Sequence, residues 1–157
     1  MRRKDREIRD KKLQKEILEN AEAIRIAFAV DNEPYIVAMN FGFEWDTNLR
    51  IYMHCAREGK KIDMLVQNNR VCFQTDTGHL LVVDAQSCRW SMNYASIVGN
   101  GTISIVADEK ERIHGLELLM KNYGKKGKNT FAAEMLQAIH VLRIDVNKIT
   151  AKKRIEA

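Results

Sequence analysis

The chain has 157 residues, of which 45% are hydrophobic and 30% are charged. This balance is typical of one globular domain and excludes a largely disordered chain. No stretch approaches the roughly 18 consecutive apolar residues of a membrane helix, and no apolar segment follows the basic N-terminus as in a secretory signal. We therefore expect a cytoplasmic protein with a single domain over residues 1–157 and no membrane partner.

The chain is basic, with 26 Lys and Arg against 21 Asp and Glu and a formal net charge of +5. A basic protein can bind nucleic acids, acidic membranes or phosphorylated small molecules. Much of the positive charge lies in the runs 2–15 and 148–154, and acidic residues interrupt the first run. We expect no nucleic-acid partner, although a nucleic-acid-binding domain remains an alternative that salt-dependent binding would reveal.

Three cysteines, Cys55, Cys72 and Cys88, are widely spaced and form no C-x-x-C pair. The four histidines show no H-E-x-x-H or other paired-ligand spacing. We therefore expect no metal site, and any difficult chemistry would depend on an organic cofactor.

Hydrophobic periodicity changes from helical to alternating near residue 24, which predicts a helix followed by strands. Asp10 is a suitable N-cap, and the turn-forming residues 31–34 predict a hairpin. In chain order, we expect an N-terminal helical segment over 1–23 with its helix over 10–23, strands over 24–30 and 35–43, a polar loop over 44–48, and a strand over 49–55.

The second half of the chain mixes strands with helices. In chain order, we expect a short helix after Lys61, strands over 71–75 and 80–83 around a turn at 76–78, and a long strand over 91–107. A helix over 109–122 capped by Asp108 and a basic loop over 125–129 follow. The chain then ends with a short helix over 131–139, a strand over 141–146 and a basic C-terminal tail over 148–157. Strands joined by short turns favour antiparallel pairing. The pattern predicts a mainly β fold, a small barrel with peripheral helices.

Gly59, Lys60 and Lys61 stand between a predicted strand and a predicted short helix. They do not form a P-loop, because His54 stands where that motif has its first glycine and Lys61 where it has Ser or Thr. Two cations beside free amide N–H groups at a helix start can nevertheless bind a phosphate group. The alternative is a solvated basic loop. His54 precedes this loop and could transfer a proton near neutral pH, or be a hydrogen-bonded structural residue.

The segments that carry a family resemblance are MRRKDREI (1–8), PYIVAMNF (34–41), IYMHCAREGKKIDML (51–65), NRVCF (69–73) and YASIVGNG (94–101). In this order they resemble the flavin-binding split-barrel family related to pyridoxamine 5′-phosphate oxidase. Within that family the chain most resembles the 5-nitroimidazole-resistance (nitroimidazole reductase) branch. The block 51–73 is the most specific part, because its strand, histidine, Gly-Lys-Lys and helix follow the family's order.

The resemblance implies a six-stranded antiparallel split β-barrel that forms a homodimer with FMN, or alternatively FAD, at the interface. It implies that Lys60 and Lys61 hold the flavin phosphate beside Gly59. Residues 37–40 would run along the isoalloxazine ring, and His54 would be catalytic. The residues that it assigns to the cofactor are Val37, Ala38, Met39, Asn40, His54, Gly59, Lys60, Lys61 and Ser96.

The C-terminal segment 148–157 does not resemble the segment that helps the oxidase proper to bind its pyridoxal substrate, so oxidation of pyridoxamine phosphate is not expected. The resemblance favours an FMN-dependent, nitroreductase-like oxidoreductase. It would pass hydride from reduced flavin to an electron-poor small molecule such as a nitroimidazole. The alternative is a flavin-binding or redox-sensing module without its own turnover.

Overall fold

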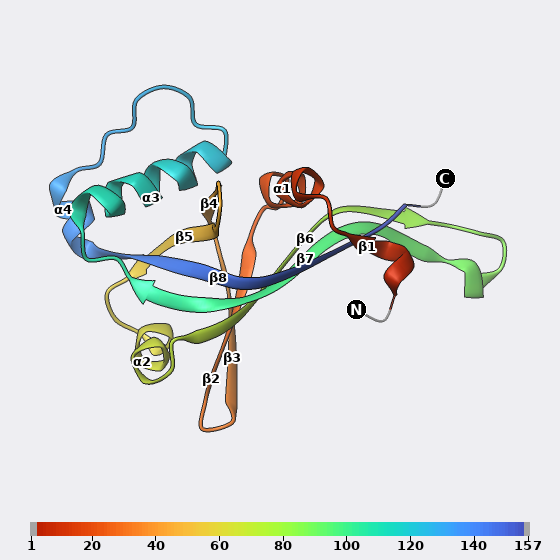
Figure 1. The fold of residues 1–157 in the computed structure, drawn as a ribbon, viewed down its shortest axis with the longest axis horizontal. Coiled ribbons are helices and arrows are strands. Elements are labelled where there is room, and N and C mark those ends of the chain that lie inside the picture. Colours follow the sequence, from red (N-terminus) through yellow and green to blue (C-terminus); the bar gives the residue numbers. More distant parts are fainter. Residues whose placement is uncertain (1–2, 156–157) are drawn as a thin grey trace.

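The computed structural model describes residues 3–155. In this part of the chain, eight strands form one antiparallel sheet in the order β3-β2-β6-β7-β8-β5-β4, with β1 beside β8 (Figure 1). The strands are β1 (Glu7–Ile8), β2 (Ile24–Val30), β3 (Glu33–Met39), β4 (Gly42–Trp45), β5 (Leu49–Ala56), β6 (Arg70–Val82), β7 (Ser91–Ile105) and β8 (Ile139–Arg154). The helices are α1 (Lys11–Glu19), α2 (Lys60–Gln67), α3 (Glu109–Asn122) and α4 (Ala133–Ala138), with 3-10 turns η1 (Lys4–Arg6) and η2 (Ser87–Arg89).

Local sequence explains the first hairpin and the ends of two helices. Asp31 and Asn32 both have positive φ, 51° and 65°, as a two-residue hairpin turn requires. The carboxylate of Asp10 accepts a hydrogen bond from the backbone N–H of Leu13 at the start of α1. Asp108 caps α3 in the same way, so these helices begin where the sequence predicts.

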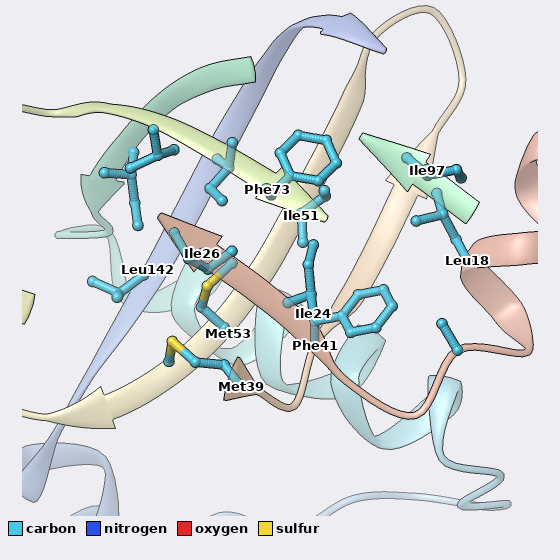
Figure 2. Packing of buried hydrophobic residues seen from close by; sticks show 14 of the residues in the cluster. Leu18, Ile24, Ile26, Met39, Phe41, Ile51, Met53, Phe73, Ile97 and Leu142 are labelled. Carbon is cyan, nitrogen blue, oxygen red and sulfur yellow. The ribbon is translucent and has the colours of Figure 1, made fainter. Parts of the chain in front are cut away.

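The interior of the barrel is apolar (Figure 2). Its fully buried side chains include Ile24, Ile26, Phe41, Ile51, Met53, Phe73, Ile97 and Leu142. The Phe73 ring lies against Gly99 on the neighbouring strand, where an added Cβ would come within 2.3 Å of the ring. A second cluster, which includes Tyr52 and Leu116, lies where α3 covers the outer side of β5. No helix within residues 3–155 is long and apolar enough to cross a membrane.

The predicted strand over 35–43 is interrupted after residue 39, and the predicted polar loop over 44–48 is shorter, because residues 44–45 belong to β4. Strand β3 ends at Met39, and the chain then turns so that β4 pairs with β5. The turn brings Gly42 against the backbone of α3, where an added Cβ would lie 2.2 Å from the amide nitrogen of Leu119. This close approach, which depends on residues far along the chain, ends β3.

The N-terminal segment 1–23 is less helical than predicted. Residues 4–8 form η1 and β1, and α1 ends at Glu19 rather than at residue 23. The Asn20 side chain donates a hydrogen bond to the carbonyl of Glu16 at the helix end. Residues 1–2 and 156–157, which belong to the predicted segment 1–23 and tail 148–157, lie outside the described residues.

Strands β6 and β8 are longer than predicted. The expected strands 71–75 and 80–83 are parts of β6, because the predicted turn at 76–78 is a bulge in a continuous pairing with β7. The expected strand 141–146 continues to residue 154, since residues 148–154 pair with β7 and, at its end, β1. The segment is therefore no tail. Strand β7 ends at residue 105 rather than 107, and the predicted helix 131–139 is the shorter α4.

The predicted six strands correspond to β2, β3, β5, β6, β7 and β8. Among the described residues the sheet has in addition the short strands β1 and β4, of two and four residues. The mainly antiparallel sheet with peripheral helices is as expected.

Candidate cofactor site

The segment from Gly59 to Lys61 forms the start of α2, directly after β5. Gly59 has φ +123°, a conformation that favours glycine. No side chain among the described residues caps the helix, while the Gly59 carbonyl accepts hydrogen bonds from the N–H groups of Ile62 and Asp63. Within residues 3–155, the first N–H groups of α2 therefore donate to no side-chain oxygen, so an anion can bind there.

Both lysines at this helix start lack a carboxylate partner. Lys60 places its Nζ 5.1 Å from the centroid of the Tyr35 ring. Lys61 is half-buried and lies near Cys55; burial raises the pKa of that thiol, and the charge of Lys61 acts in the opposite direction. Neither ammonium forms an ion pair within residues 3–155. Their charge remains available for a bound anion.

Strand β3 offers backbone hydrogen-bonding groups beside these lysines. Within the described chain it pairs only with β2, so one of its edges has unpaired N–H and C=O groups. Tyr35, beneath Lys60, is followed along this edge by Val37, Ala38, Met39 and then Asn40. The predicted phosphate site and the predicted ring-binding strip 37–40 are therefore neighbours in the fold.

His54 lies on the outer side of β5 and is exposed, between the buried residues Met53 and Cys55. Its register partner is Val141 on β8. The imidazole forms no hydrogen bond or ion pair with any residue between 3 and 155. His54 thus lies on the strand that leads to Lys60, and it is not held in a fixed orientation by a carboxylate.

Ser96 does not lie next to the lysines within one chain. It is on β7, which β6 and β2 separate from β3. The side chain is buried, with a residue exposure of 7%, and its Oγ has no hydrogen-bond partner in the described part of the protein. A buried hydroxyl without a partner is unusual and is consistent with a missing ligand.

The sequence analysis missed a polar cluster on β6 and β2. Asp76 contacts Arg25, Gln74 and His79, with distances of 2.8 Å, 2.8 Å and 2.6 Å. Burial acts to raise the pKa of Asp76, but the hydrogen bond from Gln74 and the charges of Arg25 and His79 outweigh it and lower that pKa. Residues 76–78 were expected to be a turn, so the contact between Asp76 and His79 was not predicted. Within residues 3–155 no group of His, Cys, Asp and Glu side chains could hold a metal ion.

The arrangement of the sheet and its helices defines a split β-barrel. A flavocytochrome from Azotobacter vinelandii shares it with 17% identity and a TM-score of 0.80, over 99% of this chain and 72% of that one. A FAD- and heme-binding protein from Mycobacterium smegmatis gives the same identity and TM-score, over 96% and 74%. At this level of identity the likeness shows the fold, and the split-barrel prediction is confirmed.

A family model described as pyridoxamine 5′-phosphate oxidase matches residues 10–153, so the chain belongs to this family. Among solved structures, the chain is similar to a candidate 5-nitroimidazole antibiotic resistance protein from Bacteroides thetaiotaomicron. The two are 32% identical with a TM-score of 0.81, over 94% of this chain and 86% of that one. The family resemblance inferred from the sequence is confirmed. No curated protein matches the chain.

Proposed function

We propose that the protein is an FMN-dependent oxidoreductase that reduces an electron-poor small molecule such as a nitroimidazole. One observation carries this proposal. In the part of the chain that the structure describes, two lysines without carboxylate partners stand at the uncapped start of α2, next to the unpaired edge of β3. The names of similar proteins, which include a flavocytochrome, a FAD- and heme-binding protein and a candidate nitroimidazole resistance protein, support a flavin-binding role.

Lys60 and Lys61 would hold the flavin phosphate together with the first amide groups of α2. A phosphate monoester carries nearly two negative charges at neutral pH, and two ammonium groups can form charge-assisted hydrogen bonds with it. The Tyr35 ring lies against the Lys60 ammonium group and favours its position by a cation–π contact. A flavin whose phosphate binds these lysines would extend along β3. There the backbone of residues 37–40 would bind the polar edge of the ring.

The bound flavin would supply the hydride that reduces the substrate. The protein's own part is to fix the ring and to exclude water. His54, on the strand that precedes the lysines, would hold a proton near the substrate on one of its ring nitrogens. FAD is an alternative cofactor, since the same lysines could bind its diphosphate.

We further propose that two copies of the chain form the complete site. The outer side of the sheet carries exposed apolar side chains, with exposed fractions of 66% for Ile36, 41% for Met92 and 40% for Val98. Ser96, with its unpartnered hydroxyl, belongs to the same side of β7 as Met92 and Val98. A homodimer that covers this side would bury the apolar groups and could bring Ser96 to a flavin in the interface.

Anaerobic reduction of a nitroimidazole by the FMN-loaded protein tests the activity, with either NADH, NADPH or chemically reduced flavin as the electron source. We expect loss of the nitro absorbance with repeated turnover. No turnover with any of these donors would exclude the reductase and leave a flavin-binding module. His54→Ala should lower the rate while the protein keeps its flavin, whereas a binding module has no rate to lose.

A further inference from the structure

The bulge in β6 brings two chemically active side chains together. The β6–β7 register shifts between Thr77 and Leu80, and Gly78 has φ +68°. In a regular strand, residues three apart point to opposite faces and lie about 10 Å apart. The bulge removes this separation, because the Nε2 of His79 lies 2.6 Å from the Oδ2 of Asp76. Bulges of this kind often redirect a side chain at a functional site.

Asp76 is held as an oriented carboxylate. Its Oδ1 accepts hydrogen bonds from Arg25 and Gln74, which leaves Oδ2 for His79. The low pKa of Asp76, described above, keeps the group ionised. An ionised carboxylate on Nε2 fixes the orientation of the imidazole, and the other nitrogen, Nδ1, has no hydrogen-bond partner among residues 3–155. The side chain of His79 is half-exposed in the single chain.

A cavity of about 490 Å³ adjoins this His79–Asp76 pair. The charged residues Glu22, Arg25 and Asp76 line this cavity together with His79. The volume suits a small organic molecule.

The cavity lies beside the residues proposed to bind the flavin ring. Arg25, in its wall, is paired in register with Ala38 of the strip 37–40. On the other side, Asp76 is paired with Ser96, whose buried hydroxyl has no partner in the described chain. The His79–Asp76 pair therefore stands between two of the predicted flavin contacts, on the same side of the sheet. His54, by contrast, has no carboxylate to orient it among residues 3–155.

We propose that His79 is a further catalytic residue, which donates a proton from Nδ1 to an oxygen of the substrate while Asp76 positions its imidazole. The inference rests on the proposed function. A nitro group that receives one hydride from reduced flavin and one proton becomes a nitroso group and water, with one N–O bond broken. His79 supplies this proton. Its N–H bond breaks, the electron pair stays on the neutral imidazole, and a new O–H bond forms on the substrate.

The test uses the full-length, flavin-loaded protein and the variants His79→Gln and Asp76→Asn. The matched control is His114→Gln, which changes another half-exposed histidine that contacts a carboxylate, Glu44, beside α3. General acid catalysis contributes about 10²–10⁴-fold, so we expect His79→Gln to lower kcat at least about 100-fold. KM, the flavin spectrum and the flavin Kd should change little. Asp76→Asn should lower kcat less than His79→Gln does, because the imidazole is retained and only its orienting carboxylate is lost.

A second readout does not need turnover. Imidazole NMR of the wild type should show an Nε2 proton in a strong hydrogen bond, which Asp76→Asn removes and His114→Gln retains. If this signal is absent from the wild type, the pair does not form and the inference fails. If His79→Gln keeps kcat within about twofold, or lowers it only by releasing flavin, the inference also fails. Inactive wild-type protein with an intact NMR signal would instead count against the proposed function on which the inference rests.

Discussion

The ammonium nitrogen of Lys60 lies 5.1 Å from the centre of the Tyr35 ring, and this contact joins the start of α2 to the edge strand β3. It links a cationic helix start to an unpaired row of backbone groups. A phosphate anchored by α2 and a planar ring along β3 would be held by a single continuous surface. Four predictions test this account and the fold that supports it.

Removing either lysine should weaken flavin binding. A hydrogen bond to a charged group contributes about 1.5–3 kcal/mol, so Lys60→Ala and Lys61→Ala should each raise the FMN Kd by about 10- to 100-fold. Fluorescence titration measures the change. Lys126→Ala, which alters an exposed lysine in a distant loop, is the control. Unchanged FMN affinity in both lysine variants would place the phosphate elsewhere.

The Tyr35 ring should contribute less than the charges above it. Cation–π contacts at exposed sites are worth about 0.5–1 kcal/mol. Tyr35→Leu should therefore weaken FMN binding by about two- to fivefold, and Tyr35→Phe, which keeps the ring, should bind like the wild type. The same titration compares them. Equal losses in the two variants would show that the hydroxyl group and not the ring matters.

Gly99 should not tolerate a side chain while Phe73 stands opposite. An added Cβ would lie 2.3 Å from the Phe73 ring and 2.8 Å from the carbonyl oxygen of Lys148. Overpacking of this kind costs about 1–3 kcal/mol, so Gly99→Ala should lower the free energy of unfolding by that amount in urea. Combining it with Phe73→Leu should cost less than the sum of the two changes. Val66→Ala, which shortens an exposed side chain on α2, is the control, and strict additivity would contradict the contact.

A carboxylate network joins α3 to the barrel and predicts a pH dependence. Glu44 contacts His114 at 2.8 Å and the hydroxyl of Tyr52 at 3.2 Å. Burial acts to raise the pKa of Glu44, but His114, Tyr52 and Arg50 outweigh it and lower that pKa below its usual value of 4.5. The unfolded chain therefore binds a proton at Glu44 more readily than the folded one.

The direction of the pH dependence of stability follows from this difference in proton binding. The contribution of Glu44 to stability is fully present above pH 4.5 and is lost as the pH falls through the lower folded pKa. Thermal unfolding between pH 6 and pH 3 should show this loss for the wild type, and Glu44→Gln should flatten the curve. Glu134→Gln is the control, because this exposed glutamate forms no ion pair within residues 3–155. A wild-type slope retained in Glu44→Gln would assign the acid sensitivity to other groups.

Local sequence signals predicted those parts of the fold that depend on neighbouring residues. The alternation in β2 and the caps Asp10 and Asp108 gave the hairpin and the helix starts correctly. The break between β3 and β4 was not predictable, because it depends on the approach of Gly42 to α3, far along the chain. The extension of β8 beyond residue 146 was missed because its second half is polar and forms a strand only through pairing with β7.

In the candidate site, too, features that depend on neighbouring residues were predictable and features that depend on distant contacts were not. The Gly-Lys-Lys motif at 59–61 is contiguous, so the sequence predicts a phosphate site there, and this assignment stays a prediction. The contact of Asp76 with His79 arises from a bulge that the turn-like residues 76–78 conceal. Whether His54 and Ser96 contact the flavin remains a prediction, since one lies on the outer side of β5 and the other is separated from β3 by two strands.

The central claim is that this barrel binds a flavin through the lysines of α2. The most direct measurement is the visible absorbance spectrum of the purified protein, before and after addition of FMN and passage through a gel-filtration column. We expect flavin bands that elute with the wild-type protein and are lost or greatly reduced in the double variant Lys60→Ala/Lys61→Ala. A protein that stays colourless after FMN addition, or a double variant that keeps its flavin bands in full, would contradict the account.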